Sequence, residues 1–264
     1  MIEGKKHIAI WQPYFFPYIG YWQLINAVDL FLVADNAHFI KNSRIYHNHI
    51  LGQGGQPQYF GIEISHASCT HLICETSRVV NLKRADKMCR VLEYYYKKAP
   101  HYNEAMEVIK PILLDEEPDL TRYLVKQLRA VSDYLGIKTE IRLLSEVSAR
   151  WDCRAPEVIR RACEHFGITN YINSITGTKY YDKETFREMG INLQFLRRND
   201  DIWYRQGKEQ APQPPKGGSS KRAATPPSGG RGAWAFVPDL SIIDVMMYCS
   251  RDEIHDMLDR YHFV

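Results

Sequence analysis

Residues 7–35 of this chain read HIAIWQPYFFPYIGYWQLINAVDLFLVAD. The apolar run Ile8–Trp11 is short and contains β-branched residues, which favours a buried strand over a helix. Pro13 and Pro17 follow, and because proline fixes φ and lacks a backbone N–H group, the chain must leave regular structure there. Between Gly20 and Val28, apolar residues return at the spacing of one helical face. These patterns predict a strand, an ordered loop and a helix.

A second apolar run, Leu30–Ala34, directly follows this helix and is the predicted second strand. In a βαβ unit with a right-handed crossover, the loop after the first strand lies at the carboxyl edge of the sheet, where open α/β folds bind ligands. We therefore predict that residues 12–21 form one wall of a site for a small-molecule substrate. Its candidate substrate-binding residues are Gln12, Tyr18 and Tyr21.

Strand and helix patterns keep alternating along the rest of the chain. They predict an α/β, Rossmann-like fold with a mostly parallel sheet and a helical insertion at about residues 83–135. This α/β core is expected to cover residues 1–205. Residues 206–233 are rich in Pro, Gly, Ser, Lys and Arg and poor in large apolar side chains, which predicts a disordered insertion. Residues 234–264 regain apolar patterning and are expected to pack back on the core.

Composition excludes some classes of function and favours others. The 264 residues include 34 basic and 31 acidic side chains, and this net charge of +3 gives no reason to expect nucleic-acid binding. No apolar run approaches the roughly 18 residues of a membrane span, and no signal-peptide pattern is visible. The six cysteines form no CxxC pair, which is typical of reduced thiols. We expect a cytoplasmic protein, and the sequence carries no signal for an oligomeric state.

A polar stretch at residues 36–50 reads NAHFIKNSRIYHNHI. Asn and His side chains both donate and accept hydrogen bonds, and Lys and Arg can hold an anion. The stretch therefore favours either a loop that lines a cleft or a solvated hairpin. On a strand, two of its histidines would share one face, but no third ligand is identifiable and no metal site is predicted. The candidate substrate-binding residues of this stretch are Lys41, Asn42, Arg44 and Asn48.

A second polar stretch, TGTKYYD at residues 176–182, is predicted to be a loop after a strand. Glycine allows a ligand to approach backbone amides closely, and the lysine beside it supplies a point charge. Because strand ends of an α/β sheet meet at one edge, we expect this stretch to join the other two around one crevice. No GxGxxG, GxxxxGK[ST] or GxSxG motif occurs anywhere in the chain. The candidate substrate-binding residues here are Gly177, Lys179, Tyr180 and Asp182.

Near the end of the chain, Ser241 precedes an apolar run and is predicted to be the N-cap of a helix. Asp244 stands three residues later, as in a capping box. A second interpretation, in which Asp239 or Asp244 points into the site, stays open.

The opening stretch resembles the start of the nucleotidylyltransferase-like α/β fold. In that fold a strand leads through a proline loop to an HxGH motif at a helix start, which holds nucleotide phosphates. Tyr18, Ile19, Gly20 and Tyr21 stand at the motif positions. Because both histidines are replaced, the likeness concerns the fold and does not imply that way of binding phosphate.

A second resemblance covers most of the chain. Five segments resemble successive motifs of the WbqC-like protein family: QPYFFPYIGY, HFIKNSRIYHNHI, YYYKKAPHY, NSITGTKYYDKETFREMGINLQF and FVPDLSIIDVMMY. Trp11, His47 and the 206–233 insertion depart from the family pattern. The positions that match the motifs are Gln12, Pro13, Pro17, Gly20, Tyr21, Asp35, Asn42, Asn48, Gly177, Tyr180, Asp182, Pro238, Leu240, Ser241 and Asp244.

This resemblance implies an amide-forming acyl or aminoacyl transferase that acts on an amino sugar, as a sugar nucleotide, or on a similar small amine in O-antigen-type polysaccharide biosynthesis. The donor would be an aminoacyl adenylate made from ATP or another activated acyl donor. His47 is the candidate base, because an imidazole titrates near working pH, and Asp35 is the second candidate catalytic residue. Lys41, Arg44 and Lys179 would hold phosphate or carboxylate.

Other functions stay open from the sequence. One is a non-catalytic nucleotide- or sugar-binding module, and another is an ATP-dependent ligase or nucleotidylyltransferase-like enzyme. A nucleic-acid partner is expected only if tRNA carries the donor or if the basic insertion binds nucleic acid.

Overall fold

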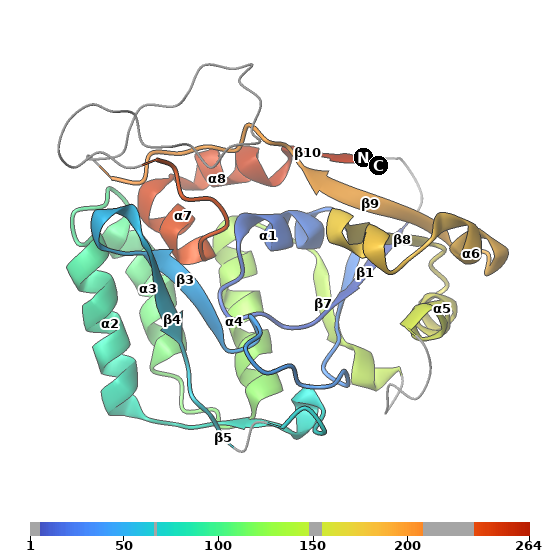
Figure 1. The fold of residues 1–264 in the computed structure, drawn as a ribbon, viewed down its shortest axis with the longest axis horizontal. Coiled ribbons are helices and arrows are strands. Elements are labelled where there is room, and N and C mark those ends of the chain that lie inside the picture. Colours follow the sequence, from blue (N-terminus) through green and yellow to red (C-terminus); the bar gives the residue numbers. More distant parts are fainter. Residues whose placement is uncertain (1–5, 66–67, 148–154, 208–234) are drawn as a thin grey trace.

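The computed structural model describes residues 6–65, 68–147, 155–207 and 235–264. Within these ranges the chain forms a six-stranded, mostly parallel sheet with helices packed on both faces (Figure 1). The predicted α/β fold class is therefore confirmed. The disordered insertion predicted at 206–233 lies outside the described residues, apart from its first two positions.

The central sheet has the strand order β10-β9-β8-β1-β2-β7, and β10 runs antiparallel to its neighbour β9. Its strands are β1 (His7–Trp11), β2 (Leu30–Val33), β7 (Glu140–Leu143), β8 (Asn170–Ser174), β9 (Asn192–Arg198) and β10 (Tyr261–Phe263). Two small antiparallel pairs accompany it, β3 (His47–Leu51) with β4 (Pro57–Gly61), and β5 (Ile64–Ser65) with β6 (Ser77–Arg78).

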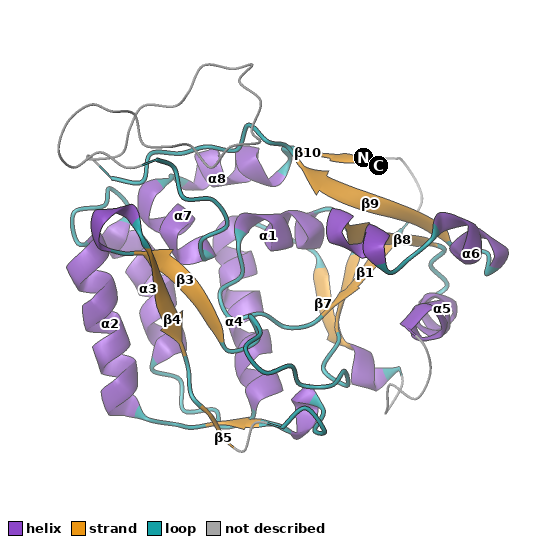
Figure 2. Cartoon of the chain, viewed as in Figure 1, coloured by secondary structure: helices purple, strands orange, loops and turns teal. Residues whose placement is uncertain are grey.

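Helices connect these strands and include the expected helical insertion, which consists of α2, α3 and α4 (Figure 2). In the described segments the α-helices are α1 (Ile19–Asn26), α2 (Leu82–Tyr96), α3 (Tyr102–Leu113), α4 (Leu120–Leu135), α5 (Ala155–Phe166), α6 (Lys183–Glu188), α7 (Ile242–Tyr248) and α8 (Arg251–Leu258). Short 3-10 helices cover Gln53–Gly55, Ile73–Glu75, Leu144–Glu146 and Ile175–Lys179.

The last of these 3-10 helices corrects one prediction. Residues 176–182 were expected to be a loop, but Ile175–Lys179 is wound into a 3-10 helix. The backbone N–H groups of Tyr180 and Tyr181 both donate to the carbonyl of Gly177, at 2.9 Å each. These short-range bonds leave no signature in apolar periodicity, so the sequence pattern missed them.

The predicted βαβ unit at the start of the chain is present as β1, α1 and β2. The two strands pair in parallel, with Ile8 opposite Leu30 and Trp11 opposite Val33. All four residues of β2 are buried, as its continuous apolar run indicates. The loop between β1 and α1 therefore leaves the sheet at its carboxyl edge, as expected from the sequence.

Side chains of the central strands alternate between two hydrophobic cores, because successive residues of a strand point to opposite faces. Ala9 and Phe31 belong to the larger core, which also contains residues of α1, α4, α7 and α8. Ile8, Ile10 and Leu32 belong to the smaller core, which contains residues of α5 and α6. This alternation produces a three-layer arrangement around the sheet.

The order of the strands places a topological switch beside β1. From β1 the chain passes to β2 and then to β7 on one side, whereas β8 and β9 lie on the other side of β1. Connections therefore leave the carboxyl ends of β1 and β8 in opposite directions. Open α/β sheets bind ligands in the crevice at such a point.

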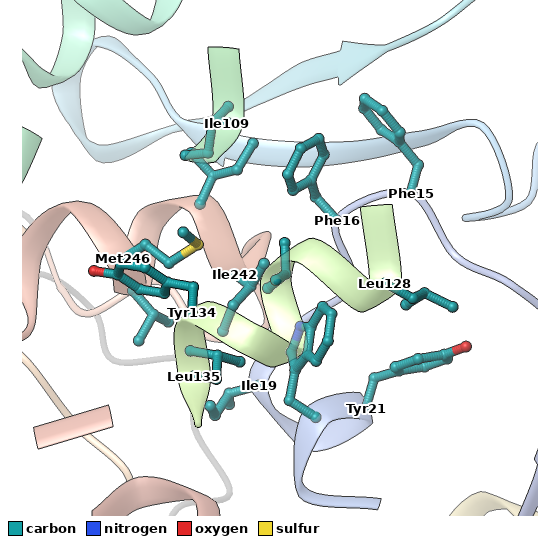
Figure 3. Packing of buried hydrophobic residues seen from close by; sticks show 14 of the residues in the cluster. Phe15, Phe16, Ile19, Tyr21, Ile109, Leu128, Tyr134, Leu135, Ile242 and Met246 are labelled. Carbon is teal, nitrogen blue, oxygen red and sulfur yellow. The ribbon is translucent and has the colours of Figure 1, made fainter. Parts of the chain in front are cut away.

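The β1–α1 loop contains a turn at Phe15 and Phe16, and Phe16 has a φ of 40°, which is uncommon for a bulky residue. Its N–H group donates to Oε1 of Gln127 at 2.8 Å. Its carbonyl accepts from Nδ2 of Asn48 at 2.7 Å and from Oγ of Ser241 at 2.8 Å. Figure 3 shows the rings of Phe15 and Phe16 next to each other, and their centroids are 4.9 Å apart. The turn is thus held by three distant segments.

Ser241 caps α7, as predicted, since its Oγ accepts from the N–H group of Ile243 at 3.2 Å. Asp244 does not complete a capping box. It is fully buried, and it accepts hydrogen bonds from the hydroxyls of Tyr96 at 2.8 Å and Tyr204 at 2.6 Å. The capping-box interpretation of Asp244 was wrong, because tertiary partners that no local pattern reveals occupy both of its oxygens.

Gln206 and Val237, which flank residues 208–234 in the sequence, are joined beside the same carboxylate. Nε2 of Gln206 donates to Asp244 at 3.1 Å and to the carbonyl of Val237 at 2.8 Å. The N–H group of Val237 donates back to Oε1 of Gln206 at 2.8 Å. Two described residues that are 31 positions apart in the sequence therefore lie side by side.

We predict that Gln127→Leu destabilises the protein by about 1–3 kcal/mol, because it leaves the buried N–H group of Phe16 without its acceptor. Denaturant unfolding of the variant measures this loss. Gln58→Leu makes the same change on the exposed surface of β4 and should alter the free energy of unfolding by less than about 0.5 kcal/mol. Equal losses in the two variants would contradict the proposed role of Gln127.

A second prediction concerns pH. Burial raises the pKa of Asp244 to about 6, against 3.8 for a free side chain. Its contribution to the free energy of unfolding is therefore fully present below 3.8 and is lost as the pH rises through about 6, a change of about 3 kcal/mol.

Asp244→Asn stays neutral, so the variant should gain stability relative to the natural protein as the pH rises through this window. Denaturant unfolding of both proteins at several pH values gives the difference, in which the other carboxylates cancel. Parallel pH profiles would contradict the prediction.

Candidate functional site

The larger of two neighbouring pockets has a volume of about 470 Å³ and lies at the carboxyl ends of β1, β2 and β8. This position is the topological switch of the sheet. Its walls are mostly apolar and aromatic. The lining residues are Ile10, Trp11, Gln12, Ala34, Ala37, His38, Ile40, Ile159, Tyr171, Asn173, Thr176, Gly177, Tyr180 and Tyr181.

Gln12 stands where β1 ends, and its backbone is fixed on two sides. Its carbonyl accepts from the hydroxyl of Tyr21 at 2.8 Å, and Pro13 after it disfavours a helical conformation at position 12. The side-chain carboxamide lines the pocket and has no hydrogen-bond partner among the described residues. A donor and an acceptor are therefore available to a ligand there.

Asn173, at the end of β8, faces the same pocket. Its Nδ2 donates to the hydroxyl of Tyr171 at 3.0 Å, and its Oδ1 accepts from the N–H group of Ser174 at 2.7 Å. Gly177 packs directly against this side chain, since a Cβ at position 177 would lie 2.9 Å from Cγ of Asn173. A glycine at position 177 therefore lets the backbone lie directly against the side chain of Asn173.

Two large side chains at the mouth of the pocket are exposed although they are apolar or aromatic. Tyr180 is 79% exposed and Ile40 is 51% exposed. Trp11, which lines the same pocket, makes edge contacts with Tyr14 and Tyr21 at ring-centroid distances of 6.5 and 6.3 Å. An apolar rim of this kind suits contact with a ring of a bound ligand.

The smaller pocket has a volume of about 230 Å³ and shares Thr176 with the larger one. It lies at the carboxyl ends of β8 and β9, beside the start of α1. Charges of both signs line it. Its lining residues are Tyr18, Gly20, Ser174, Ile175, Thr176, Leu196, Arg197, Arg198, Asp200 and Asp239.

Within the smaller pocket, Arg198 and Asp239 form an ion pair. Burial raises the pKa of the Tyr18 hydroxyl, and the negative charge of Asp239 raises it further. A Cβ at Gly20 would lie 2.6 Å from the ring of Tyr18, so the glycine lets this ring lie over the start of α1. The Ser174 hydroxyl is also near Thr176, 2.6 Å from its Oγ1.

The β3–β4 pair carries the third set of polar side chains. The ring of His47 stacks on Tyr59 at 5.0 Å, and His49 lies on the same strand face at 6.2 Å from His47. Burial lowers the pKa of His47, and the nearby His49 and Arg44 lower it further. The imidazole of His47 is therefore neutral at neutral pH, which is the form that can accept a proton.

Arg44 links this strand pair to the smaller pocket. Its guanidinium donates to Oδ1 of Asn48 and is close enough to lower the pKa of the Tyr18 hydroxyl, although burial and Asp239 outweigh it. The same positive charge acts on His47 and His49. The Arg44 side chain is thus close enough to act on both Tyr18 of the smaller pocket and the histidine pair.

The residues predicted from sequence occupy several places in this arrangement. Gln12, Gly177 and Tyr180 line the larger pocket, and Tyr18 lines the smaller one. Tyr21, Asn48 and Asp35 are buried and line neither pocket. His47 lies on β3 and Arg44 shortly before it, and both line neither pocket. The remaining predicted residues also line neither pocket: Lys41, Asn42, Lys179 and Asp182.

Several of these residues hold the walls in place. Asn48 donates to the carbonyls of Phe15 and Phe16. Both oxygens of Asp35 accept from Ser145, at 3.0 Å from its N–H group and 2.6 Å from its hydroxyl, while burial raises the pKa of this carboxyl. Asp182 caps α6, and the N–H group of Thr185 lowers its pKa.

Sequence reasoning missed the residues that follow the later strands. Asn173 and Tyr171 belong to β8, Arg197 and Arg198 end β9, and His38 follows β2. All of them except Tyr171, the second residue of β8, stand close to or after the carboxyl end of a parallel strand. The rule that predicted the Gln12 loop could therefore have found these residues other than Tyr171, had it been applied to every predicted strand.

No metal site and no membrane span appear in the described segments. No three His, Cys, Asp or Glu side chains gather there as a metal site, so His47 and His49 lack a third ligand. None of the described helices combines the length and the apolar composition of a transmembrane helix. The five cysteines in these segments are all free.

Comparison with known proteins gives the family. “Uncharacterized protein Rv1507c” of Mycobacterium tuberculosis is 26% identical over 193 residues, which are 71% of this chain and 80% of that protein. No solved structure matches the chain. The model of the WbqC-like protein family matches residues 12–212, which include both pockets except Ile10, Trp11 and Asp239. Since this match covers well over half of the sequence, the chain belongs to the WbqC-like protein family.

Proposed function

We propose that the protein is a transferase that forms an amide bond between an activated acyl or aminoacyl donor and the amino group of a nucleotide-linked sugar or a similar amine. The observation that carries this proposal is the pair of unequal pockets that meet at Thr176. A reaction between two substrates needs two neighbouring sites, because holding both reactants together supplies much of the rate enhancement.

The larger pocket is assigned to the acceptor. Its volume of about 470 Å³ lies within the usual range for small-molecule sites. Its few polar groups, such as the carboxamides of Gln12 and Asn173, can orient a ligand, while the apolar walls exclude water.

The smaller pocket is assigned to the acyl donor. Two arginines and two aspartates line it, so it can hold an ammonium group and a carboxylate or phosphate together. An aminoacyl group activated as an adenylate from ATP, or carried by another activating group, has this combination of charges. Such donors and nucleotide sugars are cytoplasmic metabolites, in keeping with the proposed cytoplasmic location.

In the proposed reaction, the amine nitrogen attacks the acyl carbonyl carbon. A C–N bond forms, the bond between that carbon and the activating group breaks, and the amine loses one proton to a base. His47 lines neither pocket, but it is the proposed base because its lowered pKa keeps it neutral and because Arg44 acts both on it and on Tyr18 of the smaller pocket. Asp35 is proposed to act indirectly, by fixing Ser145 and with it the loop after β7.

The proposal is tested by incubating the protein with amino-sugar nucleotides and three donor systems: ATP with amino acids, aminoacyl-tRNA and acyl-coenzyme A. Mass spectrometry should detect a sugar nucleotide that has gained one acyl group in at least one mixture. Binding of nucleotide sugars without any acylated product would instead indicate a non-catalytic binding module.

We predict that His47→Ala lowers kcat at least about 100-fold, the usual contribution of a general base. In the natural protein kcat should fall as the pH drops through the lowered pKa of His47, which lies below 6.5, and the variant should lose this dependence.

His255→Ala is the matched control, because His255 is exposed on α8 and lines neither pocket. If His47→Ala keeps full activity and an unchanged unfolding midpoint, His47 is not the base. The two-pocket proposal would then be tested by the mass-spectrometry assay alone.

A further inference from the structure

We infer that the larger pocket binds the nucleobase of a nucleotide ligand and that Gln12 recognises the hydrogen-bonding edge of that base. This inference rests on the proposed function in one respect, namely that the acceptor is nucleotide-linked. It goes further by assigning one chemical group of the ligand to one side chain.

The apolar floor of the pocket disfavours binding of the sugar part of a nucleotide at this place. Ile10, Ala34 and Ile159 are buried and apolar. A sugar ring placed against them would leave hydroxyl groups without partners, which costs free energy for each buried group. A flat heteroaromatic ring has two apolar faces and loses nothing by this contact.

Charge excludes the phosphates from the same place. No lysine, arginine, aspartate or glutamate lines the larger pocket among the described residues. Of the two pockets that share Thr176, it is the smaller one that arginines line. A buried phosphate needs positively charged or multiple hydrogen-bonding partners, so it belongs outside the apolar floor.

The rim of the pocket also fits a planar ring. Trp11, Tyr180 and Tyr181 line it with aromatic surface, and Tyr180 is 79% exposed in the free protein. A large exposed aromatic side chain at the mouth of an apolar pocket gains contact area when a ring stacks on it. Base stacking is of this kind and does not distinguish one base from another.

Recognition of the base then falls to Gln12. Its carboxamide offers a donor and an acceptor side by side, and each nucleobase presents a donor and an acceptor side by side on its pairing edge. The hydroxyl of Tyr21 and the ring of Pro13 hold the backbone of Gln12 in one conformation. The Cα atom of Gln12 is therefore held at the wall of the pocket, and only the torsions of its side chain remain to be ordered on binding.

The inference is tested by calorimetric titration of the full-length protein with UDP, ADP, GDP, CDP and, as a ligand without a base, ribose 5-phosphate. At least one nucleotide should bind about tenfold or more tightly than ribose 5-phosphate. Gln12→Leu should weaken that nucleotide about tenfold, the loss expected for a broken pair of hydrogen bonds, and leave ribose 5-phosphate unchanged.

Gln58→Leu, the same substitution on exposed β4, is the matched control and should bind every ligand as the natural protein does. Gln12→Glu provides a second test, because a carboxylate only accepts hydrogen bonds. It should shift the preference toward guanine, whose edge carries two adjacent donors. Unfolding midpoints of the variants verify that each is folded.

Equal affinity for ribose 5-phosphate and all the nucleotides, or unchanged nucleotide affinity in Gln12→Leu, would overturn the inference. Failure of the proposed function looks different: nucleotides bind as expected, but no acylated product forms. If an amino-sugar phosphate without a base is acylated as efficiently as the nucleotide sugar, the transferase proposal stands and the nucleobase inference fails.

Discussion

The backbone of Phe16 depends on hydrogen bonds from three distant parts of the chain. Gln127 of α4 accepts from its N–H group, while Asn48 of β3 and Ser241 before α7 donate to its carbonyl. Its φ of 40° is unfavourable for a bulky residue, so it persists only where the surroundings compensate for it. Through these hydrogen bonds, helix α4 of the helical insertion and the C-terminal segment that begins α7 are both tied to the β1–α1 loop.

The position of both pockets follows from this arrangement. The turn lies between Gln12, which lines the larger pocket, and Tyr18, which lines the smaller one. Movement of the turn would displace both walls together. Asn48 also accepts a hydrogen bond from Arg44, so the same side chain ties the charged group beside the histidines to the turn. The two proposed substrate sites therefore share one rigid support.

Part of this site was predictable from the sequence. The end of β1 follows from a local pattern, because prolines stop a strand. Gly177 was expected to let a ligand approach its backbone, but the side chain that lies against it is that of Asn173. The charged smaller pocket was not predicted. Arg198 meets Asp239 across 40 residues of chain, and no periodicity relates two positions so far apart.

By itself, the sequence determined the alternation of strands and helices and the βαβ unit at the start of the chain, and with it the loop that leaves β1 at the carboxyl edge of the sheet. Hydrophobic periodicity and proline positions are local, so they can be read without knowing the fold. Only the tertiary structure decided that β8 lies beside β1 and that Asp244 is buried between two tyrosines. Strand order and buried polar networks depend on contacts between residues that are far apart in the sequence. Such contacts leave no pattern in any one segment.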